Sequence, residues 1–292
     1  MKEDRGFENA AALLPQDIRA RALELDTQSR MRAEEFRLRT GRPPTILSRG
    51  VELPLAARAV TAKDLDALLE AATRASAHTA FSNVAGGFVT VRGGCRVGLC
   101  GEVSESAGRV LTIRRLSSVA LRIPRECRGC ADKVFPELMR GGFSDTLLIS
   151  PPGAGKTTLL RELVRKLSAT MRIALLDERG EVAGVWDGAP ELDVGEHTDV
   201  LTGADKRSGA AMLIRSMNPQ VLAMDEITAP EDVEAIRLAC GCGVTILASA
   251  HARTVEDLRR RPLYRELLSL GIFRRCLEIG PLHTYSLREA GL

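Results

Sequence analysis

The sequence predicts an α/β protein with a parallel sheet, preceded by a smaller α+β domain. Four short apolar runs in the second half of the chain alternate with helical stretches, and a Gly-rich loop joins the first run to a helix. The first half instead mixes helical periodicity with the alternation typical of antiparallel strands. Since 292 residues suffice for about two domains, we expect an α+β domain at 1–135 and a second domain at 136–292.

The N-terminal domain contains patterns of both helices and strands. Apolar residues recur at helical spacing in two stretches, and two others alternate apolar and polar residues. Gly93 and Gly94 interrupt the alternation, which predicts a hairpin with a two-residue turn. We expect helices at 17–26 and 62–76 and strands at 87–103 and 109–123.

The second domain has four near-continuous apolar runs, as parallel strands need when helices cover both faces of a sheet. The runs span 146–150, 172–178, 221–226 and 245–250. Ligands of such sheets bind at the carboxyl ends of the strands. We therefore expect the polar residues that end these runs to converge in one crevice.

Composition excludes several classes of protein. A formal charge of +3 is too weak to argue for nucleic-acid binding. No segment approaches the roughly 18 apolar residues of a membrane span, and the first residues lack the apolar core of a secretory signal. We expect a cytoplasmic protein without a transmembrane segment of its own.

Seven cysteines, an odd number, argue against a framework of disulfides. Two close pairs, Cys127 with Cys130 and Cys240 with Cys242, offer four thiolates to a zinc ion. The pairs lie far apart in the chain and the second spacing is poor for zinc. We interpret these residues as packing thiols.

The stretch "LLISPPGAGKTTLL" (147–160) predicts a phosphate-binding loop between a strand and a helix. Gly153 and Gly155 leave backbone N–H groups open to a phosphate. Lys156 can reach the β- and γ-phosphates of a nucleotide, and the Thr157 hydroxyl can ligate Mg²⁺. Ser150 stands where the usual pattern has glycine, but a small residue suffices at the end of a strand. The predicted nucleotide-binding residues are Ser150, Pro151, Pro152, Gly153, Ala154, Gly155, Lys156, Thr157 and Thr158.

The run "VLAMDE" ends in two acids with different expected roles. Asp225 is placed to hold Mg²⁺ together with Thr157, and Glu226 to act as the general base toward water. A small-molecule kinase requires no such glutamate, and no L-S-G-G-Q-like helix start marks an ABC transporter. The pattern therefore predicts an ATP hydrolase.

Two further strand ends carry chemistry. Asp177 and Glu178 close the second run, with Glu181 shortly after, and His251 follows the fourth. By the strand-end argument, these side chains also face the nucleotide.

The order of the phosphate loop, an acidic box (Asp177 and Glu178), "RSMNPQVLAMDE" and "ASAHA" resembles the order of motifs in the ATPases of type II and type IV secretion systems. Within that superfamily, the chain is most similar to the stage III sporulation protein AA family of spore-forming bacteria. The stretches that carry this likeness span nearly the whole length: "EEFRLRTGRPPTI", "GGFVTVRGGCRVGLCGEV", "RRLSSVALRIPRE" and "GCADKVFPEL".

The resemblance implies a RecA-like P-loop ATPase domain that uses ATP and Mg²⁺. It implies catalytic roles for Asp177, Glu178, Glu226 and His251. It also implies a homo-oligomeric ring, a hexamer, on the mother-cell side of the membrane, with membrane-embedded sporulation channel proteins as partners.

Two departures from the secretion-ATPase pattern concern arginines. Thr228 stands where an arginine commonly follows the Walker-B glutamate, and His197 stands where the sporulation family suggests one. We therefore expect Arg114 or Arg115 of the N-terminal domain to complete the site.

Two other function classes stay open. A slowly hydrolysing assembly scaffold would use ATP to hold a ring together, and a nucleic-acid motor would need a basic channel. The stretches 259–262 and 273–275 are basic, but such stretches are more often solvated helix faces.

Overall fold

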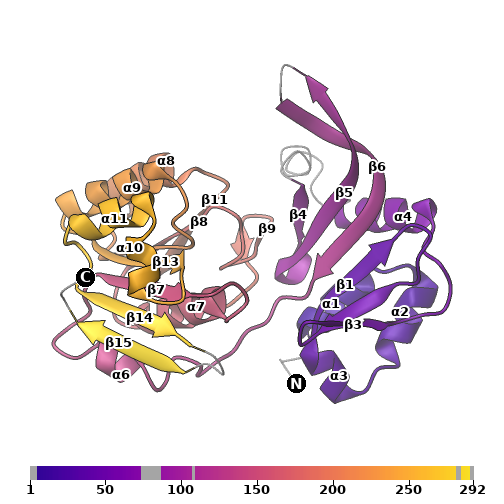
Figure 1. Cartoon of the computed structure of the whole chain (residues 1–292), viewed down its shortest axis with the longest axis horizontal. Coiled ribbons are helices and arrows are strands. Elements are labelled where there is room, and N and C mark those ends of the chain that lie inside the picture. The colour runs from indigo at the N-terminus through magenta and orange to yellow at the C-terminus, as the bar shows by residue number, and fades with distance from the viewer. Residues whose placement is uncertain (1–4, 74–86, 107–108, 281–283, 290–292) are drawn as a thin grey trace. The chain divides into compact units, whose positions relative to one another are not determined.

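The computed structural model describes residues 5–73, 87–106, 109–280 and 284–289, and its residues fall into two units (Figure 1). The first unit combines Met1–Arg125 with Gly184–Leu192, and the second combines Glu126–Ala183 with Asp193–Leu292. The first unit thus ends before residue 135, where the sequence analysis placed the domain boundary. It also contains a short segment from the second half of the chain.

Helices and antiparallel strands make up the first unit. Its elements are α1 (Arg5–Ala12), α2 (Gln16–Leu23), α3 (Thr27–Arg32), β1 (Ala33–Arg39), β2 (Thr45–Ser48), β3 (Val51–Pro54), α4 (Ala62–Thr73), β4 (Phe88–Val91), the 3₁₀ turn η1 (Arg92–Gly94), β5 (Cys95–Ser106), β6 (Arg109–Arg122), β9 (Val185–Trp186) and β10 (Ala189–Pro190).

The described strands of this unit form a six-stranded sheet in the order β3-β2-β1-β6-β5-β4, with β9 and β10 as a separate pair. Its pairs are antiparallel, as the α+β prediction requires. Helices α1, α2 and α4 supply Phe7, Ile18 and Leu65 to a core that also contains Phe36 and Leu121 from the sheet. The hairpin between β4 and β5 turns through the three residues of η1 rather than two, with Val91 paired to Cys95.

The segment Gly184–Leu192 joins this unit by packing. Trp186 lies against the core, and a Cβ on Gly184 would meet the Cα of Gly94 at 2.8 Å. The two backbones therefore approach too closely for a side chain at Gly184, whose φ of +60° also favours glycine.

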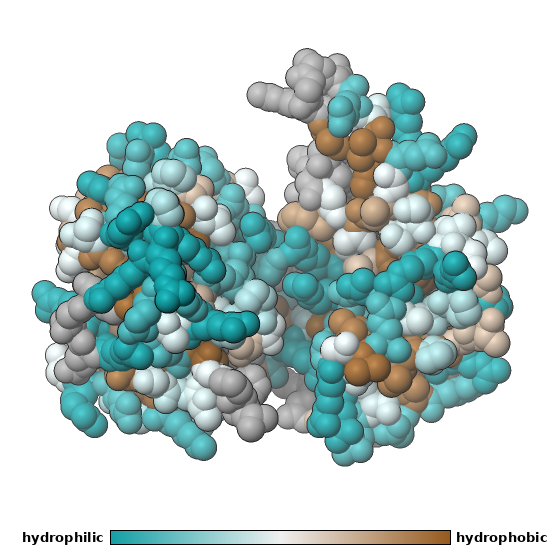
Figure 2. All heavy atoms as spheres, viewed as in Figure 1, coloured by the Kyte–Doolittle hydropathy of each residue, from teal (hydrophilic) through white to brown (hydrophobic). Residues whose placement is uncertain are grey.

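The β5–β6 hairpin extends beyond the strands on either side of it. Neighbouring β1 pairs only with 118–122 of β6, and β4 only with 95–98 of β5. Val103, Val110 and Leu111 lie on this extension and are exposed. Figure 2 shows hydrophobic residues gathered toward the free end of the hairpin.

The second unit alternates strands and helices. Its elements are α6 (Phe135–Leu138), β7 (Thr146–Ser150), α7 (Lys156–Leu167), β8 (Ile173–Asp177), β11 (Thr198–Thr202), α8 (Lys206–Met217), β12 (Val221–Met224), α9 (Pro230–Gly241), β13 (Thr245–His251), α10 (Val255–Arg259), α11 (Pro262–Ser269), β14 (Arg275–Ile279) and β15 (Tyr285–Glu289).

Within the described residues, these strands form a seven-stranded sheet in the order β11-β8-β12-β13-β7-β14-β15. The four predicted strands are its centre and run parallel. The sequence analysis did not predict β11, β14 or β15, of which β15 is antiparallel to its neighbour. The prediction of a parallel sheet preceded by a smaller α+β domain is confirmed.

Helices cover both faces of this sheet, which is why its central strands are apolar throughout. Leu147, Leu176 and Met224 belong to one cluster with buried residues of α8–α11. The alternate residues Leu148 and Leu175 are also fully buried, and α7 contacts β7, β8 and β13. In Figure 1, α8–α11 accordingly lie together and α7 lies apart from them.

No helix among the described residues is long and apolar enough to cross a membrane.

Candidate active site

The predicted phosphate loop connects β7 to α7, as the sequence pattern requires. Gly155 caps the helix with a φ of +86° and Gly153 has a φ of +76°, a conformation that glycine adopts without strain. Ser150 is the buried last residue of β7 and has no positive φ. Glycine is therefore not needed at position 150, and the serine leaves the loop intact.

Lys156 and Thr157 of the loop both contact Asp225, which follows β12. The Lys156 Nζ lies 3.1 Å from Asp225 Oδ1, and the Thr157 hydroxyl donates to Oδ2 at 2.9 Å. Burial opposes ionisation of Asp225, but the Lys156 charge and the hydrogen bonds to its carboxylate outweigh it and lower its pKa. Asp225 is therefore a carboxylate, and with the Thr157 hydroxyl it offers the oxygen ligands that suit Mg²⁺.

Ser249 connects these groups from the neighbouring strand β13. Its hydroxyl donates to Asp225, and it accepts from Lys156 Nζ at 3.0 Å and from the backbone N–H of Glu226 at 2.9 Å. The sequence analysis missed this residue. The alternation of side chains along a strand could have identified Ser249, because it lies two positions before His251 and so points to the same face of the sheet.

Glu226 is held from two sides. His251 Nε2 lies 3.2 Å from Oε1, and Arg179 Nη1 lies 3.0 Å from Oε2. Glu226 has a φ of +51°, rare for a residue with a side chain. The buried Ile227 anchors the backbone after it, with its N–H bonded to the Ser249 carbonyl and its own carbonyl to the Tyr264 hydroxyl. The strained backbone and both contacts thus fix one orientation of the carboxylate.

The two residues of the acidic box have different surroundings. The Asp177 carboxylate is buried and accepts N–H groups of Glu181, Val182 and Ala183 at 2.8–3.0 Å. Burial raises its pKa to about 6, although the hydrogen bonds from Ala183 and Val182 oppose the shift. The oxygens of Asp177 therefore accept hydrogen bonds from the loop that follows β8.

Glu178 is exposed and pairs with a lysine that the sequence analysis missed. Lys206, at the start of α8, lies 2.8 Å from Glu178 Oε2 and 3.4 Å from Asp232 Oδ2. Asp232 also accepts the N–H groups of Thr228 and Ala229. Lys206 is buried, so these two carboxylates compensate a charge that is otherwise costly to bury.

The acidic residues and the two cations line one hollow at the carboxyl ends of β8 and β12. This hollow is open to solvent. Its lining residues are Asp177, Glu178, Arg179, Glu181, Lys206, Asp225 and Glu226. The acidic residues at the ends of these two strands therefore do converge in one hollow, as the sequence analysis expected. It did not expect Arg179 and Lys206 there.

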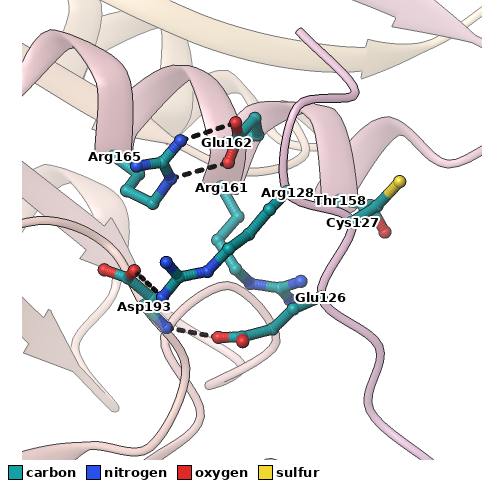
Figure 3. Close-up of a pocket in the computed structure, with 8 residues that line it drawn as sticks. All are labelled: Glu126, Cys127, Arg128, Thr158, Arg161, Glu162, Arg165 and Asp193. Atoms are coloured by element: carbon teal, nitrogen blue, oxygen red, sulfur yellow. Dashed lines mark hydrogen bonds and ion pairs between the residues drawn. The ribbon is translucent and has the colours of Figure 1, made fainter. Parts of the chain in front are cut away.

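A second hollow of about 210 Å³ lies beside α7 (Figure 3). Arg165 makes two hydrogen bonds to Glu162, and Arg128 bonds to Asp193. Its lining residues are Glu126, Cys127, Arg128, Thr158, Arg161, Glu162, Arg165 and Asp193. Thr158 therefore borders this hollow rather than the one that contains Glu226.

Arg114 and Arg115 lie on β6 of the first unit and are exposed. Arg114 donates to the Ser104 hydroxyl at 3.1 Å. They are not part of the group of side chains that the second unit brings together.

The cysteines of the two predicted pairs are free thiols. Burial raises the pKa of Cys130 to about 12 and that of Cys240 to about 11. No group of three or more metal-ligating side chains occurs among the described residues.

The fold of the second unit and its loop, acids and histidine define a RecA-like domain of the P-loop class. The model of the family "Sporulation stage III, protein AA" matches residues 5–283, so the chain belongs to that family. The stage III sporulation protein AA of Bacillus subtilis (strain 168) is 37% identical over 277 residues, which are 92% of this chain and 90% of that protein. The family expected from the sequence is confirmed.

Two solved structures share the fold at low sequence identity. The ATPase DotB of Legionella pneumophila matches with a TM-score of 0.58 and 16% identity, over 97% of this chain and 78% of that one. The pilus retraction motor PilT with bound ADP matches with a TM-score of 0.56 and 18% identity, over 92% of this chain and 84% of that one. The chain therefore shares the fold of these two proteins.

Proposed function

We propose that this protein hydrolyses ATP to drive or assemble a membrane channel complex during sporulation. One observation carries the proposal. Asp225 contacts both phosphate-loop residues Lys156 and Thr157, and the next residue, Glu226, points its carboxylate into the adjoining hollow. The residue proposed to hold the metal thus contacts the lysine proposed to bind phosphate, and the proposed base is the next residue in the chain.

The loop residues supply binding. In the proposed complex, the Lys156 ammonium leaves Asp225 for the β- and γ-phosphates, which carry more negative charge than one carboxylate. Thr157 and Asp225 then hold Mg²⁺, which when bound neutralises charge on the phosphate oxygens. ADP in the structurally similar PilT supports an adenine nucleotide as ligand.

Glu226 supplies the base. Its carboxylate accepts the proton of a water aligned with the terminal phosphate, and His251 positions it through the contact at 3.2 Å. Asp177 contributes indirectly, since it holds the loop that follows β8. Glu178 fixes Lys206 at the rim of the same hollow.

We further propose that the working unit is a homo-oligomeric ring, a hexamer, in the cytoplasm on the mother-cell side of the membrane. Its partners would be membrane-embedded channel proteins of sporulation. Membership of the sporulation family and the shared fold with DotB and PilT support this assignment.

The direct test is ATP hydrolysis by the purified chain with Mg²⁺, with and without DNA. We expect DNA-independent turnover that Lys156→Ala abolishes. Stimulation by DNA would favour a nucleic-acid motor instead.

One observation favours a slowly hydrolysing scaffold as the second candidate. Asp225 neutralises Lys156 in the structure, and Glu226 is paired through both oxygens. Nucleotide-dependent assembly with turnover no faster than that of Glu226→Gln would support the scaffold.

A further inference from the structure

Arg179 occupies a place in the site that no sequence pattern assigned to it. It follows Glu178 at the carboxyl end of β8, and its Nη1 lies 3.0 Å from Glu226 Oε2. Strand β8 is adjacent to β12, which brings the two residues together although they are distant in sequence. Arg179 therefore places a guanidinium beside Glu226, whereas the chain after Glu226 continues with Ile227 and Thr228.

The cations around the hollow differ in how firmly they are held. Lys206 is buried between Glu178 and Asp232, and Lys156 is buried against Asp225 and Ser249. The Arg179 side chain is instead 50% exposed, and the ion pair in which it takes part joins it to Glu226. An exposed arginine on a flexible stem can leave a single carboxylate at small cost, because exposed ion pairs contribute little to stability.

We propose that Arg179 is the arginine that stabilises the transferred phosphoryl group. It pairs with Glu226 in the structure and contacts the terminal phosphate when ATP is bound. The inference rests on the proposed ATP hydrolysis. A planar guanidinium matches phosphate oxygens in pairs. Its transfer to the phosphate frees Glu226 Oε2 to accept the proton of water, so one movement both stabilises the transferred phosphoryl group and releases the base.

This assignment places the arginine in the same unit of the chain as Asp225 and Glu226. The sequence analysis instead expected Arg114 or Arg115, which belong to the first unit. Arg179 shares the hollow with Asp225 and Glu226, whereas the observed partner of Arg114 is Ser104 on the paired strand.

The first test compares turnover and ATP affinity in Arg179→Ala, Arg179→Lys, Arg114→Ala and Arg115→Ala. We expect Arg179→Ala to lower kcat at least about 10²-fold, as loss of a donor to the reacting group does, with ATP affinity within a few-fold of wild type. Arg179→Lys should retain more activity than the alanine variant because it keeps the charge. Arg237→Ala is the matched control, since Arg237 is also 50% exposed and paired at 3.0 Å, with Glu266.

The second test needs no turnover. We would measure binding of ADP with aluminium fluoride and Mg²⁺, a mimic of the transferred phosphoryl group, to Arg179→Ala in the wild-type and Glu226→Gln backgrounds. A contact with the phosphate predicts weaker binding of the mimic in both backgrounds, while ADP alone binds as before. If the loss vanishes in the Glu226→Gln background, Arg179 acts only by holding Glu226 and the proposal is wrong.

Failure of this inference is distinct from failure of the proposed function. If the wild-type protein neither binds nor hydrolyses ATP, the proposed function is wrong. Active wild type with an equally active Arg179→Ala, or with the loss at Arg114 or Arg115 instead, would overturn the assignment of Arg179 alone.

Discussion

His251 ends β13 and Glu226 follows the neighbouring strand β12, and the Nε2 of the histidine lies 3.2 Å from Oε1 of the glutamate. The Nδ1 atom on the other side of the ring is buried and has no hydrogen-bond partner among the described residues. With Nε2–H facing a carboxylate, the neutral ring leaves Nδ1 as an acceptor. The imidazole is thus oriented mainly by Glu226, and each of the two side chains fixes the other.

Replacing His251 with Ala should therefore lower kcat about 10-fold to 100-fold, because a general base that has lost its orientation is less efficient. ATP affinity should stay within a few-fold of wild type, since the His251 side chain pairs with Glu226 and not with Lys156, whose partners are Asp225 and Ser249. Steady-state kinetics separate the two quantities. A variant that loses affinity and keeps kcat would assign His251 to binding.

Glu226→Gln should bind ATP like wild type and turn it over about 10²–10⁴-fold more slowly, because Gln cannot accept the proton of water. Single-turnover measurements exclude product release as the cause. Glu266→Gln, an exposed surface change in the same unit, is the control and should be fully active. Wild-type turnover in Glu226→Gln would show that another group is the base.

Lys156→Ala should weaken ATP binding by about two orders of magnitude, since truncating a charged hydrogen-bonded partner costs about 2–5 kcal/mol. Titration with a fluorescent ATP analogue measures the change. Lys166→Ala is the control on the same helix, where Lys166 pairs with Asp132 instead. ATP affinity close to wild type in Lys156→Ala would contradict the assignment of the phosphate loop.

Much of the second unit could be predicted because its signals are local. The apolar runs before Ser150, Asp177 and Asp225 are short-range patterns, and a strand, a Gly-rich turn and a helix follow one another without interruption in the phosphate loop. The apolar residues of the helix that follows the loop, Leu159 and Leu163 among them, are buried.

The pairings within the site could not be predicted, because they depend on which strands are neighbours. Arg179 meets Glu226 only because β8 lies beside β12, and Ser249 reaches Asp225 only because β13 lies on the other side of β12. Nothing in the local sequence signals the positive φ of Glu226, since a glutamate adopts it only under the constraint of its surroundings.

The raised pKa of Asp177 predicts a pH dependence of stability. Its folded-state pKa of about 6 lies above the ordinary value of 3.8, so between these pH values the folded state binds more protons than the unfolded state. The contribution of Asp177 to the free energy of unfolding therefore falls as pH rises, by at most about 1.4 kcal/mol per pH unit.

Urea denaturation of wild type and Asp177→Asn at pH 4, 5 and 6 tests this sign. The free energy of unfolding of wild type minus that of the variant should decrease across the series, because Asn does not titrate. Lost hydrogen bonds to the Glu181, Val182 and Ala183 N–H groups would shift the variant by a constant amount. A difference independent of pH would show that Asp177 ionises normally.

Ring assembly is expected to govern activity, because the reacting groups of a single chain are open to water. The side chains of Glu226, His251 and Arg179 are 23%, 33% and 50% exposed. Exclusion of water strengthens each electrostatic interaction in such a site, and a neighbouring copy in a ring would provide it. Specific activity should therefore rise with protein concentration and level off when assembly is complete, as followed by light scattering in the same samples.

Mixing wild type with excess Glu226→Gln should change the activity per wild-type chain if neighbours cooperate. A monomer whose specific activity is constant over a hundredfold range of concentration would contradict the ring.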